Sequence, residues 1–172
     1  FTLDYGPFGF CERFEPYFQP WTGGGRHFAF FNQPLAAEKN FESFCSALEV
    51  LLQSSPELIE QLDEIRDGFS SLMQGKITQM WADKLGLETF NAPLFNSLLA
   101  LMMKTHVDYT MFFRELCNIP KDVSEIAKSF YTEPDELLEN EWSEWLTSWR
   151  ESLNVAKGIE VISRNMKQVN PK

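Results

Sequence analysis

The feature that most constrains the fold of this chain is a helical period of apolar residues, which begins near residue 34 and continues to about residue 168. Apolar residues that recur every three or four positions form one face of an α-helix. The first such face consists of Phe41, Phe44, Leu48, Leu51 and Leu52. Ser54, Ser55 and Pro56 follow it, and a proline inside a helix removes a hydrogen bond and clashes with the preceding turn. The period therefore predicts a mainly α fold whose first helix ends before Pro56.

Capping residues and prolines divide the rest of the period into further helices. Ser55 is a suitable N-cap for the second helix, with Pro56 at its first position. This helix is expected to end at Gly86, and Gly68 and Gly75 allow a bend or a split within it. The later helices are expected from Asn91-Ala92-Pro93 to about Lys104, from Tyr109 to about Cys117 with Asp108 as cap, from Pro120 to Phe130, from Glu133-Pro134 to about Leu153, and over roughly 155–168.

A stripe of large side chains runs along the helix expected from Glu133-Pro134 to about Leu153. Leu138, Trp142, Trp145, Trp149 and Leu153 recur at spacings of four, three, four and four residues. This spacing is typical of a buried helix face, which is a far more common arrangement than a set of tryptophans binding a cofactor. The three tryptophans are therefore predicted to lie in the core.

The first 33 residues differ from the helical body. Phe1-Thr2-Leu3 is predicted to end a strand, which the glycines and proline of Asp4-Tyr5-Gly6-Pro7-Phe8-Gly9-Phe10 prevent from continuing. The loop that follows is rich in aromatic residues, whose apolar area favours burial over disorder: Phe14, Tyr17, Phe18, Trp21, Phe28, Phe30 and Phe31. Long loops are usually functional. We therefore divide the chain into a segment 1–33 and a single helical domain 34–172, and predict that loop 11–33 contacts a protein partner.

Composition excludes several classes of function. The formal net charge of −10 argues against nucleic-acid binding, which needs clustered Lys and Arg. No run approaches the roughly 18 apolar residues of a membrane-spanning helix. The three cysteines, Cys11, Cys45 and Cys117, are odd in number and far apart, which predicts buried thiols in a reducing compartment inside the cell.

Asp4 is the one residue whose setting indicates chemistry. It stands where a strand gives way to a turn and is followed by an aromatic residue and a glycine. In enzymes of the protein-kinase type, an Asp in such a tripeptide holds magnesium against nucleotide phosphates, because that ion prefers hard oxygen ligands. His27 and His106 have no partner at metal-ligand spacing. Arg26 and Arg114 are candidates for contact with a phosphate or a carboxylate, but a structural ion pair is the more common role of a single Arg.

The whole stretch from Asp4 to Phe10 closely resembles the segment that takes the place of Asp-Phe-Gly in the Selenoprotein O family, the YdiU-type pseudokinases. Four further segments resemble motifs of that family and occur in the same order: Gly25-Arg26-His27-Phe28 leading to Asn32-Gln33-Pro34, Lys84-Leu85-Gly86-Leu87, Val107-Asp108-Tyr109-Thr110 followed by Phe113-Arg114, and Met166 with Val169-Asn170-Pro171-Lys172. Together these matches run from one end of the chain to the other.

The resemblance implies the helical carboxy-terminal lobe of a kinase-like enzyme that transfers AMP from ATP to Ser, Thr or Tyr hydroxyls of proteins. Asp4 matches the family's metal ligand. The resemblance therefore implies that ATP binds with Mg²⁺ or Mn²⁺ at Asp4. The family's catalytic base, its second metal ligand and its phosphate-binding lobe correspond to sequence before residue 1, so residues 1–172 alone are expected to be inactive. A regulatory cysteine of some members matches Pro20, which puts redox control in doubt. The family occurs in bacterial cytoplasm and in mitochondria.

A second hypothesis belongs to a different class of function. The chain would then be a non-catalytic helical subunit that retains this lobe and uses its aromatic loop against a partner. The sequence before Phe1 discriminates between the two hypotheses, because an Asn-x-Asp-Asn-type stretch there would favour the enzyme.

Overall fold

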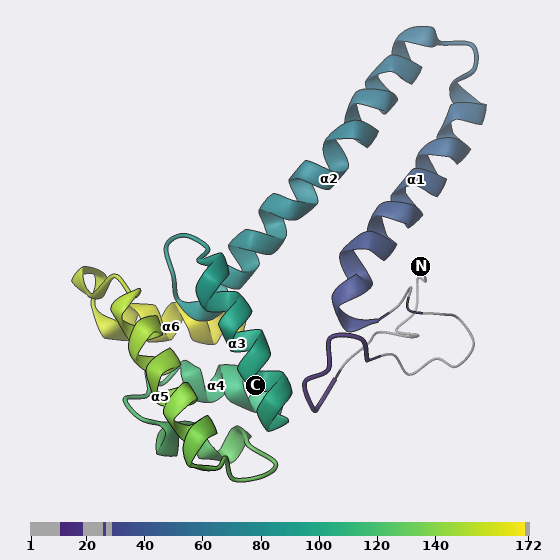
Figure 1. Cartoon of the computed structure of the whole chain (residues 1–172). Coiled ribbons are helices and arrows are strands. Elements are labelled where there is room, and N and C mark those ends of the chain that lie inside the picture. Colours follow the sequence, from purple (N-terminus) through teal and green to yellow (C-terminus); the bar gives the residue numbers. More distant parts are fainter. Residues whose placement is uncertain (1–10, 19–25, 27–28, 171–172) are drawn as a thin grey trace. The chain divides into compact units, whose positions relative to one another are not determined.

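The computed structural model describes residues 11–18, 26 and 29–170, and its described part is mainly α, as predicted (Figure 1). The predicted strand at Phe1-Thr2-Leu3 lies outside these residues. The helices, in chain order, are the 3₁₀ helix η1 (Phe30–Asn32), α1 (Gln33–Leu52), α2 (Pro56–Leu85), α3 (Ala92–Thr105), α4 (Tyr109–Leu116), the 3₁₀ helix η2 (Val123–Ser129), α5 (Glu136–Glu151), the 3₁₀ helix η3 (Val155–Lys157) and α6 (Ile159–Val169).

The chain forms two compact units. One unit contains residues 15–76 and the other contains residues 11–14 and 77–172, so helix α2 passes from the first unit into the second. The sequence-based division between residues 33 and 34 stays a prediction.

The first unit is built on a hairpin of α1 and the first part of α2. The predicted break at Ser54-Ser55-Pro56 is confirmed, since α1 ends at Leu52 and α2 begins at Pro56. Phe41 and Phe69 stack with their ring centroids 4.6 Å apart, and the Arg66 guanidinium pairs with carboxylates of both helices. Helix α2 continues through Gly68 and Gly75, so the bend or split that they allow does not end the helix.

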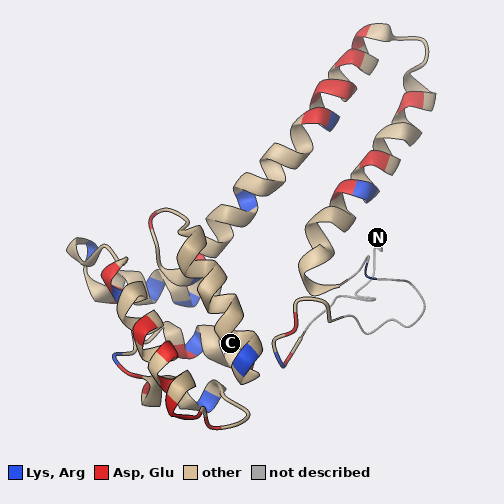
Figure 2. Ribbon diagram, viewed as in Figure 1, with Lys and Arg blue, Asp and Glu red and all other residues tan. Residues whose placement is uncertain are grey.

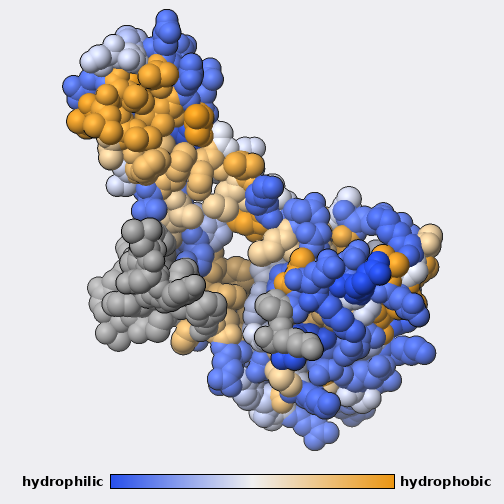
Figure 3. Space-filling view, turned by 180° about the vertical axis from the view of Figure 1, so that it is seen from behind, coloured by the Kyte–Doolittle hydropathy of each residue, from blue (hydrophilic) through white to orange (hydrophobic). Residues whose placement is uncertain are grey.

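Much of the apolar surface of this hairpin faces solvent. Of the predicted apolar face of α1, Phe44 is 55% exposed and Leu51 is 78% exposed. Figure 3 shows apolar side chains gathered over the hairpin. The exposed large apolar residues of the hairpin are Leu35, Phe44, Val50, Leu51, Leu58, Ile65 and Leu72. A two-helix hairpin has only one inner seam, so a wider apolar face cannot be buried within it.

The tryptophans of α5 form the centre of the second unit, as the sequence predicts. Trp142, Trp145 and Trp149 are all buried. The indole N–H of Trp145 donates to the Leu94 carbonyl at 3.0 Å, and that of Trp149 donates to the Leu85 carbonyl at 2.8 Å. These bonds tie α5 to α3 and to the end of α2. The indole nitrogen of Trp142 is the exception, with no hydrogen-bond acceptor among the described residues.

Local capping explains most helix boundaries in this unit. The Asn91 side chain accepts from the Leu94 N–H and the Asp108 side chain accepts from the Met111 N–H, which confirms Asp108 as the cap of α4. Such a side chain satisfies an N–H that the first turn leaves unpaired.

Three predicted boundaries are shifted. The segment expected from Pro120 to Phe130 is the shorter 3₁₀ helix η2, because Asp122 caps it at the Ser124 N–H. Helix α5 begins after Asp135, which caps it, two residues later than predicted. The last predicted helix is divided into η3 and α6 by Gly158, whose φ of +86° is not helical.

Candidate functional site

Asp4, the predicted metal and nucleotide ligand, lies outside the described residues, and so does His27. The role of Asp4 therefore stays a prediction. The first residue that the structure describes is Cys11, seven positions after Asp4. The contacts of residues 11–14 are thus the described contacts that lie nearest to Asp4 in the sequence.

Residues 11–14 are fastened to the second unit by antiparallel backbone pairing. The Phe14 N–H donates to the Val107 carbonyl at 2.8 Å, and the Tyr109 N–H donates to the Glu12 carbonyl at 2.9 Å. The Phe14 and Tyr109 rings stack with centroids 5.8 Å apart, and Cys11 and Phe14 are buried. Phe14 thus fulfils the expectation that aromatic residues pin this loop, whereas Tyr17 does not, since it is 54% exposed.

Residues 129–131 form a third segment, which pairs with residues 107–108. The Asp108 N–H donates to the Ser129 carbonyl at 2.7 Å, and Val107 forms an antiparallel bridge with Phe130. The Tyr131 hydroxyl then donates to a Glu12 carboxylate oxygen at 2.7 Å and lies 3.5 Å from a carboxylate oxygen of Asp108. Three segments that are far apart in the sequence therefore meet at one place.

The bond to Glu12 raises the pKa of the Tyr131 hydroxyl to about 12. Because this folded-state pKa lies above the ordinary tyrosine value of about 10, the bond adds stability below pH 10 that is lost as the pH rises towards 12. Absorbance titration should therefore show a phenolate step near pH 12 that Tyr131→Phe removes. Glu12→Gln removes the carboxylate and should move the step towards pH 10. A step already near pH 10 in the unmodified protein would contradict the bond.

Lys84 forms a second meeting point of distant segments. Its ammonium donates to the Asn170 side-chain oxygen at 2.7 Å, and the Asn170 amide donates back to the Lys84 carbonyl at 3.0 Å. The ammonium also lies over two aromatic rings, 4.6 Å from the Phe113 centroid and 5.6 Å from that of Tyr109. Burial lowers the pKa of Lys84, and the cation–π contacts and the amide offset part of the cost of removing the charge from water.

The residues around Lys84 and Asn170 are tightly packed. A methyl group added at Gly86 would lie 2.7 Å from the Met166 sulfur and 2.9 Å from an Ile162 methyl carbon, and the φ of Gly86 is +70°. Only glycine fits such a position without strain. Cys117 is buried beside Asn170, and burial raises the pKa of its thiol. All three cysteines are buried and free of disulfides, as predicted.

The described residues do not bring metal-ligating side chains together in a group. Residues 11–18, 26 and 29–170 include no group of three or more His, Cys, Asp or Glu side chains that would hold a metal ion. Arg26 lies over the Tyr17 ring at 4.7 Å, and Arg114 is exposed without an ion pair among the described residues, so the predicted ion pairs are not found there. Among the described helices, none is both long and apolar enough to cross a bilayer.

The two meeting points involve residues of the segments that carry the family resemblance. Lys84, Tyr109, Phe113 and Asn170 come from three of those segments and contact one another. Glu12 and Tyr131 belong to none of them, and sequence reasoning missed both. No periodicity or motif marked Tyr131, because its partner is 119 residues away.

Comparison with known proteins decides which family these segments represent. The model of the family described as "Protein adenylyltransferase SelO" matches residues 1–172. The chain belongs to this SelO family. Two relatives are named "Protein nucleotidyltransferase YdiU": one from Aromatoleum aromaticum is 32% identical over 157 residues, which are 86% of this chain and 29% of the relative. The other, from Flavobacterium johnsoniae, is 30% identical over 99% of this chain and 35% of the relative.

The chain thus spans about a third of the length of these SelO-family relatives. The names of the family and of the relatives describe transfer of a nucleotidyl group, which is the activity associated with the family. The predicted family is confirmed by this match.

Proposed function

We propose that this chain is the helical carboxy-terminal lobe of a protein adenylyltransferase, which transfers AMP from ATP to Ser, Thr or Tyr hydroxyls of other proteins. The observation that carries the proposal is the SelO family match, which covers residues 1–172 and includes the stretch from Asp4 to Phe10. In the proposed reaction, the acceptor hydroxyl oxygen bonds to the α-phosphorus of ATP, the bond to the β-phosphate breaks, and pyrophosphate leaves. The hydroxyl proton passes to a base outside residues 1–172.

Asp4 is proposed to supply one oxygen ligand for Mg²⁺ or Mn²⁺ on the nucleotide phosphates. A carboxylate is the type of ligand that these ions prefer. Within the described residues, no group of three or more His, Cys, Asp or Glu side chains could hold a metal ion by itself. The family resemblance places the second metal ligand in sequence before residue 1.

The described residues support this proposal through positioning. Catalysis of phosphate-group transfer depends mainly on holding several groups in place at once. The backbone bonds of Glu12 and Phe14 with residues 107–109 fix the chain eight to ten residues after Asp4, and Tyr131 binds the Glu12 side chain at the same place. We infer that these contacts fix the position of the chain directly after the stretch from Asp4 to Phe10.

Labelled ATP tests the proposed activity. The full-length protein, incubated with Mg²⁺ or Mn²⁺ and an acceptor protein, should attach label from the α-phosphate of ATP and none from the γ-phosphate. Residues 1–172 alone should attach neither label, because the proposed base and second metal ligand lie outside them. Attachment of the γ-label would show phosphoryl transfer instead. Attachment of either label by residues 1–172 alone would contradict the proposal that the base lies outside these residues.

The non-catalytic scaffold is the alternative to this proposal. It predicts that the full-length protein attaches neither label under any of these conditions. The same assay therefore separates the two functions.

A further inference from the structure

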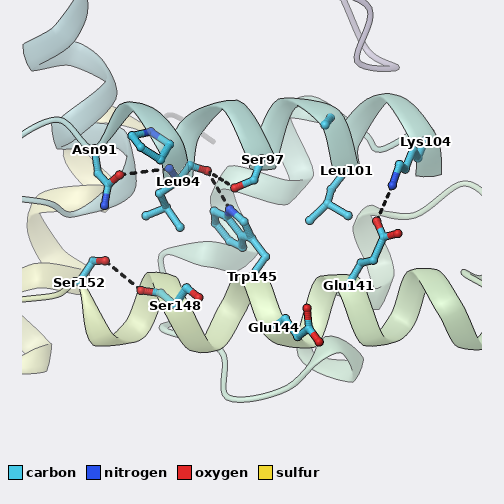
Figure 4. Close-up of a pocket in the computed structure, with 12 residues that line it drawn as sticks. Asn91, Leu94, Ser97, Leu101, Lys104, Glu141, Glu144, Trp145, Ser148 and Ser152 are labelled. Carbon is cyan, nitrogen blue, oxygen red and sulfur yellow. Dashed lines mark hydrogen bonds and ion pairs between the residues drawn. The ribbon is translucent and has the colours of Figure 1, made fainter.

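A groove runs between α3 and α5 on the second unit, and its side chains point to a class of ligand. The two helices lie antiparallel, with Asn91 near Ser152 at one end and Lys104 near Glu141 at the other (Figure 4). The cavity between them has a volume of about 560 Å³. This value lies within the range of about 300–1,000 Å³ that is usual for ligand sites.

Small side chains keep the groove open. Ser97 and Ala100 line it on α3, and Ser148 and Ser152 line it on the α5 side. All four are exposed, and none is large enough to fill the space between the helices. Below them lies an apolar floor formed by Leu94, Leu101 and Trp145, which are buried.

Hydrogen bonds hold the floor and one end of the groove in place. The Leu94 carbonyl accepts from the Trp145 indole N–H at 3.0 Å and from the Ser97 hydroxyl at 2.9 Å. At one end, the Lys104 ammonium pairs with the Glu141 carboxylate at 2.6 Å. A preformed site loses less conformational entropy when it binds a ligand than a site that must first become ordered.

The charge beside the groove is negative. Glu141 is neutralised by Lys104, whereas Glu144 also lines the groove and has no ion-pair partner within the described part of the chain. Helix α5 carries five glutamates and a single arginine, and Figure 2 shows acidic residues along it. The net charge of the whole chain is −10. A partner that carries positive charge is therefore complementary to this face.

We propose that the groove docks a short extended segment of the acceptor protein, in which an apolar side chain that packs on Trp145 is flanked by Lys or Arg. From Pro93 to Lys104 the α3 wall is about 16 Å long at 1.5 Å per helical residue, which matches about five residues of extended peptide. A basic side chain of the peptide pairs with Glu144. The assignment to the acceptor protein rests on the proposed function, but the docking of such a segment does not.

Fluorescence anisotropy of the full-length protein with a labelled Lys-Leu-Lys-Leu-Lys peptide tests the groove. Binding to the unmodified protein should saturate, and a Glu-Leu-Glu-Leu-Glu peptide should not bind. Ala100→Trp fills the groove and Glu144→Lys reverses its free charge, so each should weaken binding by about tenfold or more. Asn96→Trp, on an exposed part of α3 outside the groove lining, and Glu139→Lys, on α5 outside the lining, are matched controls and should change binding less than twofold.

Three outcomes would overturn the proposal: no saturable binding of the basic peptide, equal weakening by Glu139→Lys and Glu144→Lys, or unchanged binding to the Ala100→Trp protein. The second would show attraction to the acidic helix as a whole. If the protein is active, Ala100→Trp should also raise KM for an acceptor that carries such a segment while leaving kcat unchanged. Peptide docking without AMP transfer would contradict the proposed function but support the docking groove. AMP transfer without peptide docking would contradict the docking groove but support the proposed function.

Discussion

Replacing Trp149 by alanine is expected to lower the free energy of unfolding by about 3–5 kcal/mol, the usual cost of truncating a buried tryptophan. The Trp149 side chain is fully buried and stacks on Trp145 with ring centroids 6.0 Å apart. The truncation leaves a cavity at the centre of the second unit. It also leaves the Leu85 carbonyl without the indole N–H that it accepts at 2.8 Å, and an unpaired buried acceptor adds to the cost.

Two further variants separate these contributions. Trp149→Phe removes the indole N–H but keeps much of the ring volume, so its effect should be smaller than that of the alanine variant. Leu137→Ala, on the same helix, is the control: Leu137 is 68% exposed, so its loss should change stability by less than about 0.5 kcal/mol. Chemical denaturation of the full-length protein, followed by far-ultraviolet circular dichroism, measures all three. A Trp149→Ala effect as small as that of the control would show that the stripe is not in the core.

Asp4→Asn is expected to lower the proposed adenylyl transfer by the full-length protein by about a hundredfold or more. The substitution removes the charge proposed to bind the metal, and such charges contribute several kcal/mol to catalysis. Asparagine keeps the size of the side chain and much of its ability to bond within a turn. The melting temperature without ligand should therefore stay nearly constant, whereas Mg²⁺-dependent affinity for ATP should fall.

Asp135→Asn provides a matched control for this substitution. Asp135 caps α5 through the Leu138 N–H, and asparagine caps helices about as well as aspartate. The same chemical change at this position should leave both activity and melting temperature unaltered. An Asp4→Asn protein that transfers AMP at the unmodified rate would remove the one metal ligand proposed in this chain, and the scaffold hypothesis would then be favoured.

The sequence determined the features that depend on neighbouring residues. The break at Ser54-Ser55-Pro56, the cap at Asp108 and the buried stripe of tryptophans all follow from periods and caps that act within one or two helical turns. The errors at the starts of η2 and α5 have the same local origin, because each predicted start was placed at a proline, whereas Asp122 and Asp135 cap the helices slightly later in the chain. The SelO family was equally accessible from the sequence, because each of its motifs is a short continuous stretch and the motifs occur in a characteristic order.

Contacts between residues that are distant in the sequence become visible in the folded structure alone. Lys84 and Asn170 are 86 residues apart, and Glu12 and Tyr131 are 119 residues apart, yet each pair shares a hydrogen bond of 2.7 Å. The exposure of Phe44 and Leu51 could not be predicted from the sequence either. A helical period identifies an apolar face but does not show whether other residues cover it. Such contacts depend on how helices pack and where loops return, which no short stretch of sequence encodes.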